Sequence, residues 1–126
     1  MRREPVPLTR QLGMYAYRGH TVLELRGEID ILAATEMGPS LDRVTGRAGL
    51  RAVIDLRPVE FFDCSGLRLL YRARARVLER GGRLDLVCTH PLTLRILRTT
   101  GLTRLLPPQP DLEAALARSE AASGSL

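Results

Sequence analysis

Two short aliphatic segments, Ala52–Leu56 and Leu84–Cys88, constrain the fold most strongly. Ala52–Leu56 (AVIDL) is almost continuously apolar, which is typical of a central strand buried on both faces. A helix-length segment separates it from Leu84–Cys88, and strands joined through a helix lie parallel in one sheet. The chain is therefore predicted to build a layered α/β fold.

A β-hairpin is predicted ahead of these strands. Gln11–Tyr17 has a weak strand pattern and His20–Arg26 (HTVLELR) a stronger one. Arg18 and Gly19 between them are typical of a tight turn. The hairpin adds an antiparallel pair, so the predicted sheet is mixed.

The first two predicted helices flank the segment Ala52–Leu56. Pro39 lies inside the first helical pattern and predicts either a kink or a late start near Thr35. The second helix is predicted from about Ser65 to Arg80 and is ended by a pair of glycines, Gly81 and Gly82. Its predicted inner face consists of Leu67, Leu70, Val77 and Leu78.

The last third of the chain continues the alternation. Pro91 suits the first turn of a third helix, which Gly101 closes. Thr103–Leu106 is predicted as a short strand, and Asp111 is a good N-cap for a last helix over Leu112–Arg118.

These elements predict one α/β domain with a mixed sheet of four to five strands, an N-terminal β-hairpin and about four helices. The expected domain covers residues 11–118. Residues 1–10 hold two prolines and three arginines and are expected to form a flexible arm, and residues 119–126 a flexible tail.

The composition limits the function classes. All 19 basic residues are arginines, which suggests a GC-rich genome, and this weakens the net charge of +5 as an argument for nucleic-acid binding. It can still steer association with an acidic partner. There is no signal-peptide pattern and no apolar run long enough to cross a bilayer. We therefore expect a cytoplasmic protein in which Cys64 and Cys88 are isolated reduced thiols.

One segment, Phe61–Leu67 (FFDCSGL), carries the candidate chemistry because it lies between a buried strand and a helix. Ser65 falls where the helix begins, and exposed N–H groups and the positive end of the helix dipole would stabilise a phosphoryl group there. Asp63 could orient the hydroxyl or touch a kinase-bound metal, and Gly66 would let a partner backbone approach. The structural alternative is that Ser65 is a plain N-cap.

The sequence resembles the STAS domain family, and within it the bacterial anti-sigma factor antagonists. Gly27–Asp30 (GEID) is similar to the family's G-E-[LI]-D, and Val53–Leu56 to its central strand. Phe62–Leu67 resembles its D-[ST]-[ST]-G-[LV] phosphorylation site. Thr100–Leu102 (TGL) and Asp111–Leu116 (DLEAAL) match the end of its third helix and its last helix.

The resemblance runs from about Met14 to Arg118 and implies a partner switch. An unphosphorylated antagonist binds an anti-sigma factor and frees a sigma factor. The anti-sigma factor is a kinase that uses ATP and magnesium to phosphorylate the serine before the glycine, here Ser65, and a phosphatase resets the switch. Cys64 departs from the family pattern, which has serine or threonine there.

The resemblance further implies a binding protein, not an enzyme. No cofactor is expected, and no metal either, because the histidines and cysteines show no recognised ligand spacing. The expected contacts to the partner are Glu28, Asp30, Phe62, Asp63, Cys64, Ser65, Gly66, Arg68 and Arg72. The arginines belong to a stripe at four-residue spacing that continues through Arg76 and Arg80 and could equally be a solvated helix face. Likewise, Asp30 could simply cap the following helix and Glu28 be solvated.

Other functions stay open. A STAS module can serve a lipid-transport accessory subunit or a stressosome-like sensor. A serine hydrolase would need His20 or His90 as the base for Ser65, and the sequence lacks the G-x-S-x-G elbow. The sequence also leaves a dimer possible, and neither direct nucleic-acid nor membrane binding is expected.

Overall fold

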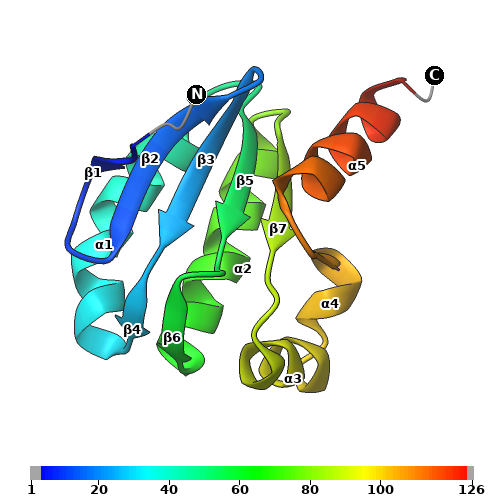
Figure 1. The fold of residues 1–126 in the computed structure, drawn as a ribbon. Coiled ribbons are helices and arrows are strands. Elements are labelled where there is room, and N and C mark those ends of the chain that lie inside the picture. The colour runs from blue at the N-terminus through cyan, green and yellow to red at the C-terminus, as the bar shows by residue number, and fades with distance from the viewer. Residues whose placement is uncertain (1–3, 125–126) are drawn as a thin grey trace.

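A six-stranded mixed sheet forms the centre of the protein, with the strand order β1-β2-β3-β5-β7-β8 (Figure 1). The computed structural model describes residues 4–124. The predicted α/β class is confirmed, and the two outermost strands have only two residues each. The strands of this sheet are β1 (Val6–Pro7), β2 (Leu12–Tyr17), β3 (His20–Leu25), β5 (Arg51–Asp55), β7 (Arg83–Val87) and β8 (Pro108–Gln109).

The predicted hairpin is the antiparallel pair β2 and β3, in which Tyr17 lies opposite His20. Arg18 and Gly19 form the turn and both have positive φ angles, 48° and 80°. Two positive φ angles give a two-residue turn the twist that matches its strands. The hairpin thereby sets the register of the N-terminal half of the sheet.

The predicted parallel strands follow from β3 onward. β5 pairs in parallel with β3 on one side and with β7 on the other. Every residue of β5 except Arg51 is buried, as the aliphatic pattern indicated. The carboxyl ends of these three strands therefore point to the same edge of the sheet.

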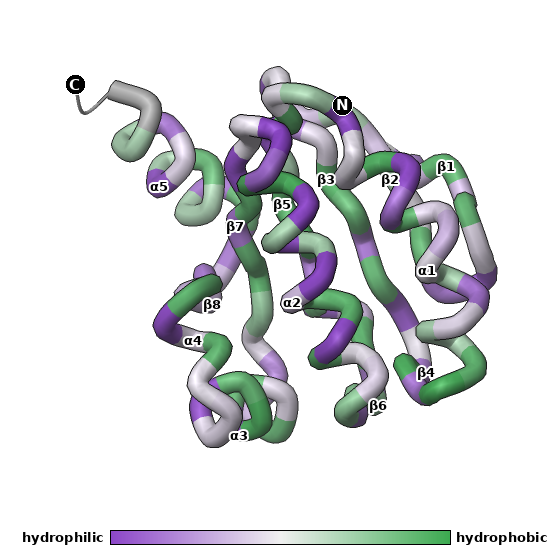
Figure 2. Tube along the Cα trace, turned by 180° about the vertical axis from the view of Figure 1, so that it is seen from behind, coloured by the Kyte–Doolittle hydropathy of each residue, from purple (hydrophilic) through white to green (hydrophobic). Residues whose placement is uncertain are grey.

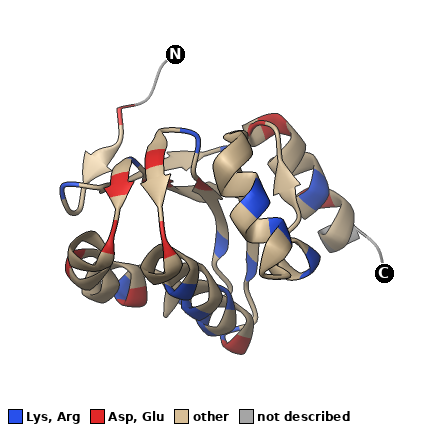
Figure 3. Cartoon of the chain, turned by 90° about the horizontal axis from the view of Figure 1, so that it is seen from below, with Lys and Arg blue, Asp and Glu red and all other residues tan. Residues whose placement is uncertain are grey.

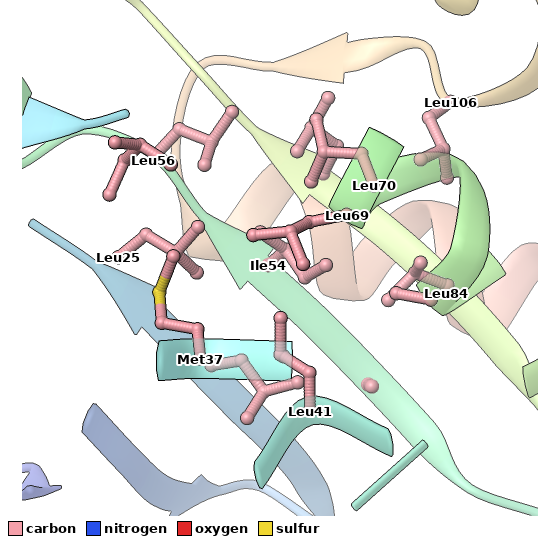
Figure 4. Close-up of a cluster of buried hydrophobic side chains, with 14 of the residues drawn as sticks. Leu25, Met37, Leu41, Ile54, Leu56, Leu69, Leu70, Leu84 and Leu106 are labelled. Atoms are coloured by element: carbon pink, nitrogen blue, oxygen red, sulfur yellow. The ribbon is translucent and has the colours of Figure 1, made fainter. Parts of the chain in front are cut away.

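Helices cover both faces of the sheet unequally. The helices α1 (Ile31–Thr45) and α2 (Cys64–Glu79) pack on one face, and α5 (Leu112–Gly124) lies against the other (Figure 1). In the close-up, Met37 and Leu41 lie near Leu69, Leu25 and Ile54, which joins both helices to the sheet (Figure 4). The smaller cluster on the opposite face consists of Val22, Val53, Val87, Ala115 and Leu116.

Of the two alternatives predicted for Pro39, the late start near Thr35 is wrong, since α1 begins at Ile31. Asp30 caps its N-terminus. Pro39 lies inside the helix, where it removes one hydrogen bond. The buried side chains of this face, such as Met37, offset that cost, so the helix continues through the proline.

The buried face of α2 also differs in part from the prediction. Leu70 and Val77 are buried, but Leu78 is 48% exposed. One residue turns a helix by about 100°, so the neighbour of a buried Val77 points outward. Along α2 the trace alternates between hydrophobic and hydrophilic residues (Figure 2). Gly81, with φ of 72°, follows the end of the helix as expected.

The segment predicted as a loop between residues 57 and 64 contains a further strand, β6 (Val59–Phe62). It pairs in parallel with β4 (Gly27–Ile29) to form a separate two-stranded sheet. The prediction of a plain loop is therefore wrong. The reason is that β6 depends on a partner about thirty residues earlier, which no local pattern reveals.

The remaining helices are α3 (Pro91–Thr99) and the single turn α4 (Leu102–Leu105). The predicted strand Thr103–Leu106 is thus wrong. Gly101 adopts φ of 84° and turns the chain directly into α4. The extended segment comes slightly later, as β8, which pairs with β7.

Both ends of the expected domain contain more structure than the sequence indicated. Val6 and Pro7 of the predicted arm pair with β2. Asp111 caps α5 as expected, since its Oδ1 accepts from the Ala114 N–H at 2.8 Å. The helix then continues past Arg118 to Gly124. The rest of the predicted arm and tail, residues 1–3 and 125–126, lies outside the described residues.

Prolines mark both edges of the sheet. Pro7 belongs to β1 and follows Pro5, while Pro108 belongs to β8 between Pro107 and Pro110. Proline has no N–H to donate to a neighbouring strand.

Candidate functional site

The two-stranded sheet of β4 and β6 brings the starts of α1 and α2 together. The Asp63 N–H donates to the Ile29 carbonyl at 3.3 Å, which ties the end of β6 to β4. Each helix is then capped by the aspartate that follows its strand. Asp30 accepts from the Ala33 N–H at 3.0 Å, and Asp63 accepts from the Ser65 N–H at 2.8 Å.

Ser65 is therefore not the N-cap of α2, because Asp63 has that role and Ser65 is the second helical residue. The Ser65 side chain is half-buried, and its hydroxyl makes no hydrogen bond with any residue that the structure describes. The first turn of α2 contains no acidic residue. A polar hydroxyl thus stands at the positive end of a helix without a structural partner.

Ser65 opens into a shallow groove of about 240 Å³ between α1 and α2. Ala34 and Thr35 of α1 form one wall, and Arg68 and Leu69 of α2 form the other. The Thr35 hydroxyl donates to the Ile31 carbonyl, so it is already engaged within its own helix. Among the groove hydroxyls, that of Ser65 is the one left available.

The predicted arginine stripe divides into two roles. Arg72 binds Asp42 of α1 through two hydrogen bonds of 2.7 Å, and these bonds chiefly lower the pKa of Asp42 below its ordinary value. Arg76 donates to the Asp42 carbonyl at 2.6 Å and to Thr45 at 3.2 Å. Both arginines hold α1 against α2. Arg68 is exposed and makes no ion pair within residues 4–124, so it can meet a ligand.

Phe62, predicted to touch a partner, does not reach the surface. It is 3% exposed, whereas its neighbour Phe61 is 52% exposed. The Phe62 ring packs on Gly66, where an added Cβ would lie 2.6 Å from a ring atom. The expected contacts of Phe62 and Gly66 with a partner are therefore corrected. Gly66 is small because the chain's own ring needs the space.

Exposed apolar side chains surround this end of the molecule, and all of them except Phe61 lie outside the candidate segment Phe61–Leu67. Ile31 and Leu32 begin α1 and are 68% and 74% exposed. Phe61 and Leu92 line a second groove of about 260 Å³ between β6 and α3. Apolar residues at a helix start would have been a usable signal. We call Ile31, Leu32, Phe61 and Leu92 the apolar rim.

Carboxylates lie between the parts of the apolar rim. Glu28 and Glu60 are exposed, while Asp30 and Asp63 are half-buried by their capping roles. Viewed from below, acidic positions mark the segments that lead into the helices (Figure 3). Cys64, the first residue of α2, is exposed. Together these groups form an acidic, partly apolar surface around the Ser65 hydroxyl.

The histidines and the second cysteine lie elsewhere. His20 is buried, with its Nε2 3.0 Å from the Ser119 Oγ. His90 caps α3, where its Nδ1 accepts from the Leu92 N–H. Cys88 is buried, and burial raises the pKa of its thiol to about 11. Within the described part of the chain, no group of three or more potential ligands could hold a metal ion.

No helix among residues 4–124 combines the length and the apolar character that a membrane crossing needs.

Comparison with known proteins identifies relatives of this chain. A family model described as the STAS domain matches residues 11–115. A protein of Paenibacillus polymyxa named anti-sigma F factor antagonist is 25% identical over 114 residues, which cover 90% of this chain and 97% of that protein.

Solved structures share the fold. The crystal structure of an anti-sigma factor antagonist from Mycobacterium paratuberculosis aligns with a TM-score of 0.77 and 29% identity, over 85% of this chain and 91% of that chain. The Bacillus cell fate determinant SpoIIAA, solved in its phosphorylated form, aligns with a TM-score of 0.66 over 86% of this chain and 98% of that chain. At 19% identity, the latter shows the shared fold alone.

Proposed function

The chain belongs to the STAS domain family, and on this premise we propose that it is an anti-sigma factor antagonist that is switched by phosphorylation of Ser65. The names of the Paenibacillus and Mycobacterium relatives support the antagonist role, since each covers most of this chain. The partner is an anti-sigma factor with serine kinase activity, and a phosphatase removes the phosphoryl group. The protein itself acts by binding, not by catalysis.

The observation that carries the proposal is the unpartnered Ser65 hydroxyl at the N-terminus of α2. Asp63 holds the Ser65 backbone N–H, so the side chain is not needed to cap the helix. In the kinase step the γ-phosphoryl group of ATP passes to the Ser65 Oγ, ADP leaves, and the hydroxyl proton is released. The fold loses no internal hydrogen bond among the described residues.

The phosphorylated form is compatible with the fold. Phosphorylation adds about −1.5 to −2 charges, which the N-terminal end of a helix stabilises. Arg68 follows Ser65 by three residues and lines the same groove, so its guanidinium can bind the new phosphate. Arg72 is less available because it is paired with Asp42. The same modification would therefore leave the domain folded.

The effect falls instead on the partner-binding surface. We assign to this surface Glu28, Asp30, Asp63 and Cys64 around Ser65, flanked by the apolar rim, which takes the role first expected of Phe62. A dianionic phosphate here joins carboxylates that are already negative. A partner matched to the unmodified surface would then face an unpaired buried charge, which commonly costs 2–5 kcal/mol.

A serine hydrolase is disfavoured by the positions of the histidines. The groove of Ser65 is lined by no histidine within the described residues. His20 is buried beside Ser119, and His90 lines the other groove, beyond β6. Ser65 thus lacks the neighbouring base that an activated nucleophile requires.

Phosphosite mapping and titration calorimetry with the cognate anti-sigma factor test the proposal. Incubation with the kinase and ATP should modify Ser65. Ser65→Asp should weaken binding by roughly 30- to 4,000-fold, the equivalent of the cost above, while Ser65→Ala should bind like the wild type. Ala117→Asp, an equal charge on α5, is the control. Modification mainly at another residue, or equal affinities for wild type and Ser65→Asp, would exclude the switch.

A further inference from the structure

A second polar site lies at the outer edge of β7, away from Ser65. β8 pairs only with Leu86 and Val87, so within residues 4–124 the first half of β7 has no strand beside it on that side. A pocket of about 110 Å³ occupies this position, between α2, the α4–β8 connection and α5. This volume holds several water molecules or one small polyatomic ion.

Asp85 orients two of the three arginines that line the pocket. Its side chain is 3% exposed, and Arg83 binds it at 3.0 and 3.1 Å. The Arg118 Nε lies 3.4 Å from the same carboxylate. A guanidinium has five N–H donors, so most donors of Arg83 and Arg118 remain for another group. The buried carboxylate thus preorganises cationic donors from β7 and α5.

Arg74 of α2 adds a third positive charge. It is half-buried, lines the same pocket and makes no ion pair in the described part of the chain. No acidic residue lies three or four positions from it on the helix. Three guanidiniums and one carboxylate leave the pocket with a net charge of +2. Like charges repel one another, and a bound anion would relieve this repulsion.

The backbone contributes a further donor. The Arg83 N–H points to β5, where it donates to the Leu50 carbonyl. Successive N–H groups along a strand alternate in direction, so the N–H of Leu84 points to the open edge, and Leu84 lines the pocket. Guanidiniums and backbone N–H groups are together the usual donors to phosphate oxygens.

We propose that this pocket binds a dianionic phosphate group, either free phosphate or the phosphate of a small monoester. The charge of the ligand matches the pocket, and the donors converge from α2, β7 and α5. Arg74 follows Ser65 by nine residues, which is about 14 Å along the helix. The phosphate site is therefore separate from the partner-binding surface, and its test does not depend on the proposed function.

Amide NMR titration of the full chain tests this proposal. Inorganic phosphate and glycerol 3-phosphate are each titrated against sodium chloride at matched ionic strength. The expected result is a saturable shift at Leu84 with both phosphates and none with chloride. Tighter binding of the ester would identify a phosphorylated metabolite as the source, and equal binding would identify free phosphate.

Variants distinguish a defined site from general attraction to a basic protein. Arg74→Gln and Arg118→Gln should each weaken phosphate binding by about tenfold or more, because each removes charge-assisted hydrogen bonds. Arg98→Gln, on the exposed side of α3, should bind like the wild type. Arg74 makes no described ion pair, so its variant should fold even if the α5 variant does not. Absence of saturation, or unchanged affinity in Arg74→Gln, would overturn the proposal.

Discussion

The neighbours Phe61 and Phe62 are expected to respond in opposite ways to the same substitution. Phe62 is 3% exposed and packs on Gly66, whereas Phe61 is 52% exposed. Phe62→Ala should lower the free energy of unfolding by about 3–5 kcal/mol, the usual loss for a buried phenylalanine. Phe61→Ala should change it by about 0.5 kcal/mol or less, as for other surface sites.

These losses can be measured directly. A domain of this size has a total stability of about 5–15 kcal/mol, so Phe62→Ala removes a large part of it. At about 4 °C per kcal/mol, the melting temperature should fall by about 12–20 °C. Urea denaturation followed by far-UV circular dichroism suits a chain without tryptophan. The affinity for the anti-sigma factor should show the opposite order, since Phe61→Ala should weaken binding by about tenfold.

The contact between Phe62 and Gly66 provides an internal check. Gly66→Ala should destabilise the wild type by about 1–3 kcal/mol, because the new methyl group overlaps the ring. In a Phe62→Ala background the same change should cost much less, since the ring is gone. Equal stability losses for Phe61→Ala and Phe62→Ala, or additive effects of Gly66→Ala and Phe62→Ala, would refute the assignment of the two rings.

Three further predictions follow from the site. Asp63→Ala should lower the free energy of unfolding by about 0.5–2 kcal/mol, because the helix loses its N-cap. Ser65→Ala should change it by about 0.5 kcal/mol or less. Thermal melts of both variants check this difference. The hydrogen bonds from Arg72 lower the pKa of Asp42 from 3.8. The ion pair therefore stabilises the fold above that pH, and this stabilisation is lost as the pH falls through the lower pKa of the folded state. The stability gap between wild type and Asp42→Asn should accordingly be present at neutral pH and close below pH 3.8 in acid titrations. Exposed Cys64 should react with iodoacetamide in the native protein, while Cys88, with its pKa raised to about 11, should react only on unfolding, and mass spectrometry would reveal any other order.

The layered fold could be predicted because its signals are local. The aliphatic run of β5, the turn at Arg18 and Gly19, and the cap at Asp111 each act within a few residues. The pairing of β4 with β6 could not be predicted in this way, since neither segment has a strong strand pattern alone. Pro39 suggested a late start of α1 as one of two alternatives, but the cap at Asp30 starts the helix before it.

The same distinction applies to the site. The position of Ser65 near the start of a helix follows from its place between a strand and an amphipathic segment, and the structure corrects only which residue is the cap. Which of the adjacent phenylalanines faces outward depends on the register of β6 against β4. The engagement of Arg72 with Asp42 depends on how α1 and α2 pack. Neither is encoded in the spacing of the motif.

The prolines at the two sheet edges bear on how this chain can assemble. An exposed strand edge is a template on which further chains can add and polymerise. Here β1 and β8 carry Pro7 and Pro108, which cannot donate the next ladder bond, and both strands have only two residues. Growth of the sheet from chain to chain is therefore disfavoured at these two strands. A dimer, which the sequence leaves possible, is therefore expected to use other parts of the surface than β1 and β8. Contacts of that kind can be made and released without disrupting the sheet, as the proposed switch requires.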